Sequence, residues 1–432
     1  MYPGAEGDAN EKKTPVSFLK RFYFSLNQFM TSKTFCILPW KHLFVGNSGR
    51  FFPCCMTEHQ ETYLCNPEHK ELSAKKRTDW KLAFNSPQIL EMRRQMLEGL
   101  RPEICQKCFT LEDQGNVSHR QVQNALFFNH YTQKQVDFSS GPRDLSEVLS
   151  LDLRPGNVCN LVCRMCNPET AMGWLAEWEK LYPGDLDEEE KKEYTKLDWF
   201  ESFEINNFLG LKKLHFAGGE PFLCKEIPTL LKKLIKDNRA HEIHLSFNTN
   251  LTLIPFWVKE TFPYFAGVQL MVSLDGIGLV NDYIRYPSKF SLIEKNLFYI
   301  DKNFDSLNLV EVNILSTIQL YNSFSLTDLF LFPKQFKSIK SDLCINYLFD
   351  PYPLSIQVLP SKIKDELTNR LNIFLENKSL SSQDIENIKS IIKFMNEKDL
   401  SGLFSEFCRF TNILDKSRKQ RVQDFITELP QW

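Results

Sequence analysis

Residues 148–166 read VLSLDLRPGNVCNLVCRMC, and this stretch decides the kind of fold to expect. Its first six residues are mostly apolar, as in a buried strand. The loop that follows carries Cys159, Cys163 and Cys166 at the spacing CxxxCxxC. Three thiolates so close on one loop can ligate three irons of a [4Fe–4S] cube and leave the fourth iron without a protein ligand. Zinc is the alternative, although zinc sites usually offer two CxxC pairs and this is a triplet.

Outward from this loop, the chain repeats strand, loop and helix. Five further strand-like segments follow, at residues 213–217, 243–247, 268–274, 310–317 and 343–349. Helix-like stretches lie between them, at residues 226–236, 254–261 and 290–303. This alternation is typical of a parallel sheet with crossover helices. The sequence therefore predicts an α/β fold of six β/α units.

Short polar motifs follow several of these strands. Gly218-Gly219-Glu220-Pro221 comes after the second strand, and residues 246–250 after the third. Ser273-Leu274-Asp275-Gly276 comes after the fourth, with Arg285 a little beyond. Each motif alone is an ordinary loop. Together they lie at the carboxyl ends of parallel strands, where such sheets bind ligands.

Cysteines also crowd the N-terminal part of the chain. The chain has 12 cysteines, and nine of them precede residue 167. Residues 35–112 are irregular apart from a helical stretch around 86–100. They hold a C…CC…CxxC set, with Cys65 as a spare candidate, and the set comprises Cys36, Cys54, Cys55, Cys105 and Cys108. Four sulfurs of this set can bind a second [4Fe–4S] cluster, a zinc ion or nothing.

The three late cysteines are isolated from one another. We interpret Cys224, Cys344 and Cys408 as small buried apolar residues. Disulfides are not expected, because the chain is long and its first residues lack the charge pattern and apolar core of an export signal.

Composition excludes several classes of protein. The 432 residues include 52 Lys+Arg and 54 Asp+Glu, for a net charge of -2. A chain with this balance has no overall positive electrostatic potential that would attract the phosphates of a nucleic acid, so no nucleic-acid partner is expected. No apolar run reaches the roughly 20 residues of a membrane span, so no membrane partner is expected either. We expect a cytoplasmic protein.

The remaining segments are predicted from local patterns. Residues 1–14 are polar, and the next segment up to residue 30 has the spacing of an amphipathic helix. An insertion at residues 171–208 carries an acidic run, 185–190, which we interpret as the solvated start of a helix. Beyond residue 360 the pattern is helical, with Ser361 as the expected N-cap.

Taken in order, CxxxCxxC, GGEP, TN, SLDG and the distal arginine resemble the radical SAM superfamily, in particular its members with SPASM or twitch auxiliary domains. The resemblance covers roughly residues 35–350. It implies a partial (β/α)6 TIM-like barrel, a [4Fe–4S] cluster on Cys159, Cys163 and Cys166, and S-adenosylmethionine bound to the free iron. Catalysis would then begin with a 5′-deoxyadenosyl radical that abstracts hydrogen from a substrate.

The resemblance also implies roles for the motif residues. Gly218, Gly219 and Glu220 would receive the methionine amine of S-adenosylmethionine. Ser273 and Arg285 would contact its carboxylate or ribose. The ribose would also approach Asn250, and Met165 would pack near the adenine. The sequence identifies no catalytic acid or base.

The N-terminal string CxxPW, PCC and CxxC resembles the auxiliary-cluster motif of these proteins, although here it precedes the barrel. It implies a second [4Fe–4S] cluster on Cys36, Cys105, Cys108 and one or both of Cys54 and Cys55. The predicted domains are a tail and helix at 1–30, an auxiliary iron–sulfur domain at 31–145, a core barrel at 146–360 and a helical extension at 361–432.

The resulting hypothesis is a radical SAM enzyme. Its expected partners are an electron donor such as a flavodoxin or ferredoxin and a substrate that is a peptide, a protein or a small metabolite. The alternative is a non-catalytic iron–sulfur or zinc-binding scaffold that keeps the barrel for binding alone. Formation of 5′-deoxyadenosine separates the two, because a scaffold makes none.

Overall fold

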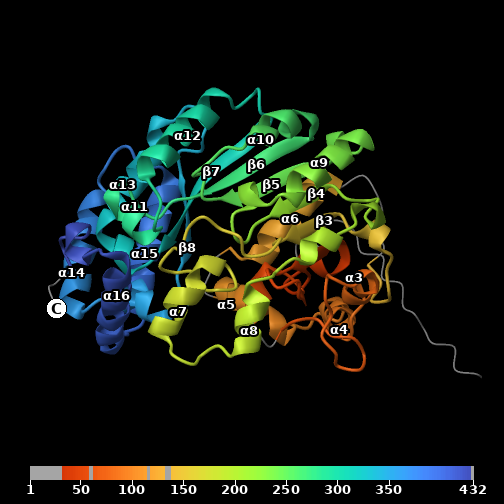
Figure 1. Cartoon of the computed structure of the whole chain (residues 1–432), viewed down its shortest axis with the longest axis horizontal. Helices are drawn as coiled ribbons and strands as arrows, with labels where there is room; N and C mark the ends of the chain where they lie inside the picture. The colour runs from red at the N-terminus through yellow and green to blue at the C-terminus, as the bar shows by residue number, and fades with distance from the viewer. Residues whose placement is uncertain (1–31, 58–61, 114–116, 132–137, 430–432) are drawn as a thin grey trace, which may run out of the picture.

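The computed structural model describes residues 32–57, 62–113, 117–131 and 138–429 (Figure 1). The amphipathic helix expected within residues 1–30 lies outside these ranges. The described residues build an eight-stranded sheet with the strand order β2-β1-β3-β4-β5-β6-β7-β8. The strands are β1 (His42–Val45), β2 (Phe51–Phe52), β3 (Ser150–Leu153), β4 (Lys213–Phe216), β5 (His244–Thr249), β6 (Gly267–Ser273), β7 (Leu309–Ile318) and β8 (Leu343–Tyr347).

The six strands from β3 to β8 are all parallel and neighbour one another in chain order. The predicted α/β fold with an open parallel sheet is therefore confirmed. Because connections between parallel strands cross from one end of the sheet to the other, every loop after a strand opens at the same edge. The cysteine loop after β3 and the motifs after β4, β5 and β6 share that edge.

The two faces of the sheet differ in chemistry. Leu151, Leu214 and Leu245 are aligned in register and almost wholly buried. Neighbouring positions point to the other face, where the aligned residues are polar: Asp152, His215, Ser246, Gln269 and Glu311. Figure 1 shows the crossover helices α9 (Glu226–Lys236), α10 (Phe256–Thr261) and α12 (Phe290–Lys302) together on one side of the sheet. The apolar face thus packs in the core under these helices, and the polar face is the opposite side of the open sheet.

The crossover helices match the predicted stretches closely. They are α9 (Glu226–Lys236), α10 (Phe256–Thr261) and α12 (Phe290–Lys302), with a short α11 (Leu279–Ile284) before the last. Helix α10 starts later than predicted because Pro255 takes the extended N-cap position. Within the 171–208 insertion, α7 (Leu175–Leu181) is followed by α8 (Glu188–Tyr194). Asp187 caps α8 in a capping box, so the acidic run does begin a helix, as predicted.

The N-terminal segment contributes β1 and β2 to the same sheet. Strand β1 pairs in parallel with β3, and β2 pairs with β1 in antiparallel fashion. The sheet therefore continues across the predicted domain boundary between residues 145 and 146. The helices of this segment are α2 (Leu38–Lys41), α3 (Arg77–Phe84), α4 (Pro87–Leu97), α5 (Gln106–Asp113) and α6 (His119–Tyr131). Ser86 caps α4, inside the predicted helical stretch.

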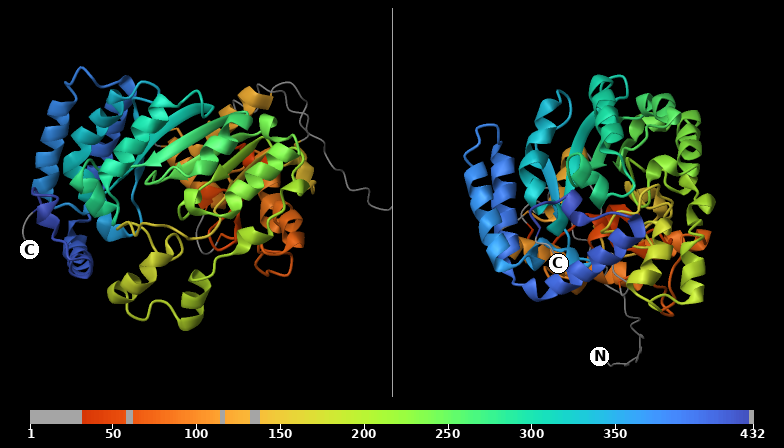
Figure 2. Two further views of the ribbon diagram at one scale, coloured as in Figure 1. Left: turned by 45° about the horizontal axis from the view of Figure 1, so that its top comes forward. Right: turned by 60° about the vertical axis from the view of Figure 1, so that its left-hand side comes forward.

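Helices α14 (Ser361–Phe374), α15 (Ser382–Glu397) and α16 (Phe404–Arg418) follow the last strand and gather at the β8 end of the sheet (Figures 1 and 2). The expected cap at Ser361 is wrong. Pro360 is the N-cap and makes no side-chain hydrogen bond, and Ser361 is already the first helical residue. No helix in the described part of the chain combines the length and the apolar character of a membrane span.

Candidate functional site

The loop after β3 brings the three cysteines of CxxxCxxC together. Cys163 is buried, and Cys159 and Cys166 are partly exposed. Burial raises the pKa of Cys159 to about 12, and the neighbouring thiol of Cys163 contributes to the rise. The hydrogen bond with Cys166, followed by burial, holds the pKa of Cys163 well above its ordinary value. Thiols in such a position become thiolates when a metal supplies positive charge.

The spacing of these side chains is not that of a single-ion site. Within the ranges the structure describes, no group of three or more His, Cys, Asp or Glu side chains is arranged to hold one metal ion. A [4Fe–4S] cluster contains four metals, and each thiolate ligates a different iron. The donor set of the loop, three thiols of which one is fully buried, has the chemistry such a cluster requires.

The Gly218-Gly219 turn packs directly against the start of the cysteine loop. Both glycines have positive φ, +75° and +52°. A Cβ on Gly219 would lie 2.5 Å from the carbonyl oxygen of Val158, and the Glu220 N–H donates to that same oxygen at 2.8 Å. Gly219 is thus required by contact with Val158, the residue that precedes Cys159, whereas a Cβ on Gly218 would meet Arg154 and Asn47.

The carboxylate of Glu220 joins this turn to the end of β5. It accepts hydrogen bonds from the Thr249 hydroxyl at 2.8 Å, the Asn250 N–H at 2.7 Å and the Phe222 N–H at 3.0 Å. Burial raises the pKa of Glu220 to about 7 against these three donors. Glu220 therefore fixes the neighbouring loops and is a buried group that titrates near neutrality.

Asn250 connects this turn to the cysteines. Its Nδ2 donates to Asn160 Oδ1 at 2.9 Å and lies 3.9 Å from the sulfur of Cys159. The structure thus brings Gly219, Glu220 and Asn250 to the Cys159 side of the loop.

Arg285 lies on the Cys163 side. Its Nη1 is 4.0 Å from the sulfur of Cys163, and its Nε is 2.7 Å from Oδ2 of the fully buried Asp275. Sequence reasoning quoted Asp275 in the SLDG motif and assigned it no role; its signal was an acid directly after a buried strand. Ser273 ends β6 and is partly exposed at the same edge of the sheet.

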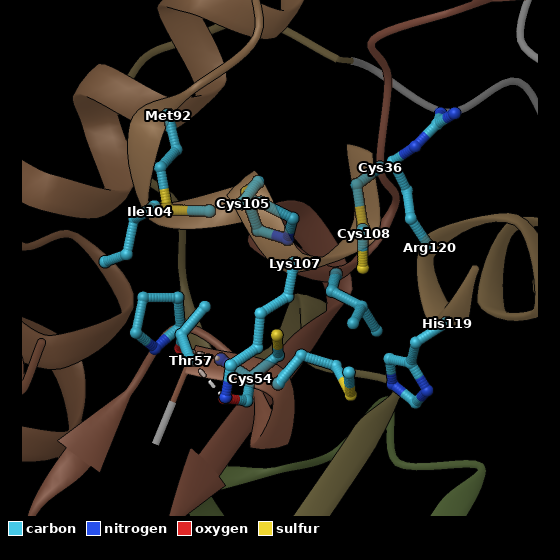
Figure 3. Close-up of a pocket in the computed structure, with 14 residues that line it drawn as sticks. Cys36, Cys54, Thr57, Met92, Ile104, Cys105, Lys107, Cys108, His119 and Arg120 are labelled. Atoms are coloured by element: carbon cyan, nitrogen blue, oxygen red, sulfur yellow. Dashed lines mark hydrogen bonds between the residues drawn. The ribbon is translucent and has the colours of Figure 1, made fainter. Parts of the chain in front are cut away.

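A second group of cysteines lines a cavity in the N-terminal segment (Figure 3). Cys36, Cys54, Cys105 and Cys108 all face this cavity, whose other walls are mostly apolar. Burial raises the pKa of each of the four thiols, and nearby thiols add to the rise at Cys36, Cys54 and Cys105. The donor chemistry suits a cluster or zinc.

Cys55 and Cys65 lie differently. The sulfur of Cys55 is 3.7 Å from Nε2 of His119, and Cys55 is not among the residues that line the cavity. Cys65 forms a β-bridge with Glu71, and its sulfur is 3.9 Å from the carbonyl oxygen of Tyr63. Of the adjacent pair, Cys54 is the one that points toward the other three cysteines.

The late cysteines are not fully buried, which corrects the interpretation made from sequence. Cys224, Cys344 and Cys408 are all partly exposed. The thiol of Cys224 donates to Glu226 Oε2 at 3.2 Å, so it behaves as a polar group at the start of α9. Sequence position alone did not reveal these neighbours.

Comparison with known proteins finds similarity in the central part of the chain. Residues 153–310 match the model of the radical SAM superfamily. GTP 3′,8-cyclase of Syntrophomonas wolfei subsp. wolfei is 30% identical over 93 residues, which are 22% of this chain and 24% of that protein. The match thus spans about a quarter of that curated relative.

Two solved structures are also similar. The structure of anSMEcpe with bound AdoMet and Cp18Cys peptide is 21% identical, with a TM-score of 0.34, over 53% of this chain and 60% of that one. SuiB of Streptococcus suis bound to S-adenosylmethionine is 12% identical, with a TM-score of 0.31, over 67% of this chain and 61% of that one. Both TM-scores are too low to support an argument about activity. The family match is the stronger similarity: residues 153–310 are similar to the radical SAM superfamily.

Proposed function

We propose that this protein is a radical SAM enzyme that reductively cleaves S-adenosylmethionine and abstracts hydrogen from a substrate. The observation that carries the proposal is the convergence at one sheet edge of three thiols, the Glu220 turn and Arg285. Cys159, Cys163 and Cys166 would hold the [4Fe–4S] cluster. When bound, the cluster and S-adenosylmethionine supply one-electron chemistry and a reactive carbon radical, which the side chains of the protein do not supply.

The chain's own residues would bind and orient the cofactor. The Gly218-Gly219 turn holds its backbone against Val158 and so sets the position of Cys159. Glu220 and Asn250 supply an acceptor and a donor beside that cysteine. Arg285, on the opposite side, would supply a cation for a carboxylate while its Nε stays beside Asp275. Ser273 would contribute a hydroxyl from the end of β6.

The polar face of the sheet is the surface we propose for the substrate. Asp152 is mostly buried, and its Oδ1 has no hydrogen-bond partner among the described residues. Its neighbour in register, His215, shares a 3.0 Å contact with the Ser246 hydroxyl. Unsatisfied buried acceptors in a polar interior favour a substrate with hydrogen-bond donors. A peptide, a protein segment or a polar metabolite fits this requirement, with a flavodoxin or ferredoxin as the electron donor.

The N-terminal cavity would hold a second cluster on Cys36, Cys54, Cys105 and Cys108. Four thiols leave no iron open, which favours electron transfer or structural support over substrate binding. Zinc in the same four-sulfur site is the alternative.

The test is anaerobic reconstitution with iron and sulfide, followed by dithionite and S-adenosylmethionine. We expect 5′-deoxyadenosine by liquid chromatography and mass spectrometry, and none when dithionite is left out. A protein that binds about four or eight irons yet makes no 5′-deoxyadenosine would instead be the non-catalytic scaffold.

A further inference from the structure

The backbone of the cysteine loop is held by residues far away in the chain. The N–H groups of Val162 and Arg164 donate to the carbonyls of Tyr286 and Ile284 at 2.7 and 2.8 Å. The indole N–H of Trp174 donates to the carbonyl of Cys163 at 2.9 Å. These bonds fix the backbone on both sides of the buried cysteine.

Arg164, inside the CxxxCxxC motif, is fully buried and reaches the end of α16. Its Nη2 donates to Asp415 Oδ1 at 2.5 Å, and its guanidinium lies over the ring of Tyr283, 3.6 Å from the centroid. The Tyr283 hydroxyl donates to the same oxygen at 2.8 Å, and the N–H of Val422 donates to Oδ2 at 2.7 Å. Asp415 therefore ties the loop to the C-terminal segment.

Arg418, one helical turn further along α16, makes a second connection. Its Nη2 donates to the carbonyl of Val162 at 2.8 Å. The same guanidinium forms a buried ion pair with Glu177 of α7, at 2.6 Å, and lies 5.3 Å from the centroid of Trp174. One arginine thus joins the cysteine loop, the insertion and the C-terminal helix.

The charges around the loop are balanced in pairs. Arg164 is paired with Asp415, Arg418 with Glu177 and Arg285 with Asp275. Each pair contains one of the arginines that contact the loop, and each carboxylate comes from a different element. Because these charges are buried, their fields are weakly screened, and removing one charge of a pair leaves the other acting on the loop.

From this arrangement we propose that Asp415 and Arg418 position the cysteine loop and set the reduction potential of the cluster bound there. The proposal rests on the proposed function, since it needs a cluster on Cys159, Cys163 and Cys166. Reduction adds a negative charge, so a nearby positive charge favours the reduced cluster and a nearby negative charge disfavours it. Residues some 250 positions away in the sequence would therefore tune the electron transfer that starts the reaction.

The test is an EPR-monitored redox titration of the reconstituted full chain. The EPR signal to follow is the one that changes when S-adenosylmethionine is added. This signal belongs to the cluster on the cysteine loop, because a cluster ligated by four thiolates has no open iron for S-adenosylmethionine. Asp415→Asn leaves Arg164 unbalanced, so we expect a more positive midpoint potential. Arg418→Gln leaves Glu177 unbalanced, so we expect a more negative one.

Three further variants complete the test. Glu177→Gln should shift the midpoint potential in the positive direction. If Arg418→Gln does not fold, this variant still tests the Arg418–Glu177 pair, because it removes the other charge of the pair. Arg418→Lys keeps the charge and should restore the wild-type midpoint. Arg409→Gln is the matched control. Arg409 lies on the same helix, pairs with Glu406 and donates to the carbonyl of Leu181 in α7, but its hydrogen bonds and ion pairs among the described residues do not reach the cysteine loop.

The outcomes separate this inference from the proposed function. If the wild type shows no signal that responds to S-adenosylmethionine, the proposed function fails. If the wild type shows this signal and its midpoint potential is unchanged from wild type in Asp415→Asn, Arg418→Gln and Glu177→Gln, the role proposed for Asp415 and Arg418 is wrong. Midpoint shifts of the same sign in Asp415→Asn and Arg418→Gln would also overturn the proposal. The two variants remove opposite charges, so a common sign would mean that the shift comes from a loosened loop and not from charge.

Discussion

The two groups of cysteines are built in opposite ways. Cys159, Cys163 and Cys166 lie on one loop among charged and polar neighbours, with Arg285 on one side and Asn250 on the other. The N-terminal four come from separate segments and meet in a cavity with mostly apolar walls. Under the proposed function, the triplet, with polar groups beside it, would hold a cluster that binds a further ligand. The quartet in its mostly apolar cavity would hold a cluster that does not.

Buried ion pairs lie beside both groups, and more of them lie beside the triplet. Buried ion pairs surround the triplet, and each includes an arginine that touches the loop or its cysteines. Beside the quartet, Arg120 is paired with Glu112 and donates to the carbonyl of Phe35 next to Cys36. The comparison predicts that the two sites respond separately to mutation, because no cysteine is shared between them.

The largest effect is expected from replacing Cys159, Cys163 and Cys166 together with Ala. We expect the loss of about four irons per chain and of all 5′-deoxyadenosine formation, since the loop then has no thiolate for iron. About four irons should stay in the N-terminal set, with a broad absorption near roughly 400 nm. Iron analysis, absorption spectra and product assay measure these quantities.

The matched control replaces the three late cysteines, Cys224, Cys344 and Cys408, with Ala. Iron content and product should stay at the wild-type level. Unchanged 5′-deoxyadenosine in the loop variant would refute the assignment of the triplet. If the loop variant instead holds one zinc and no iron, the N-terminal set is a zinc site.

The next effect distinguishes Cys54 from Cys55. Cys54→Ser should remove the second cluster, about four irons, because Cys54 is the member of the pair that lines the cavity. Cys55→Ser should keep it, because the sulfur of Cys55 contacts His119 instead. Iron content after reconstitution measures both. Equal loss in the two variants would mean that the cavity rearranges when it binds metal.

A smaller effect is expected at the glycine turn. Gly219→Ala places a methyl group 2.5 Å from the Val158 carbonyl and should displace the start of the cysteine loop. We expect affinity for S-adenosylmethionine to fall at least about tenfold, or roughly 1.4 kcal/mol, by calorimetry on the reconstituted protein.

Gly184→Ala is the control for backbone strain. Gly184 also has positive φ, +76°, but a Cβ there meets nothing within 4 Å. In both variants an alanine in the left-handed conformation costs about 1–2 kcal/mol. Only the methyl group of Gly219→Ala contacts the cysteine loop. Equal affinity in the two variants would show that the contact with Val158 does not matter to the site.

The smallest effect is a pH dependence that comes from Glu220. Burial raises its pKa to about 7 in the folded protein, from an ordinary value of 4.5. The folded state then binds more protons than the unfolded state between these values. The free energy of unfolding should therefore fall as pH rises through 7, by about 3 kcal/mol in total.

Denaturant unfolding of the metal-free protein at pH 5 and pH 8 measures the contribution of Glu220 to the free energy of unfolding. Glu220→Gln has no carboxyl to titrate at this position, so the fall between pH 5 and pH 8 should be smaller in the variant by about 2.5 kcal/mol, the part of this contribution that lies between these two pH values. If wild type and variant lose equal stability between the two pH values, Glu220 is ionised throughout.

Local patterns predicted much of the sheet. The six parallel strands were found because each is a short apolar run bounded by turn residues, and α9 was found at its observed limits. Strand β1 was missed because four residues in a cysteine-rich segment show no period of their own. Its place was decided by pairing with β3. The residue type of Ser361 predicts an N-cap, whereas Pro360 is the N-cap and Ser361 is the first residue of that helix.

For the candidate sites, the sequence by itself determined the triplet. Eight residues of one loop contain all three thiols, and chain connectivity alone keeps them close. Only the tertiary structure decided that Cys54, and not Cys55, faces Cys36, Cys105 and Cys108. It also decided that Arg164 meets Asp415, a contact between positions 251 residues apart. Spacing along a chain limits which residues can share a loop, but contacts between distant segments depend on how the whole core packs.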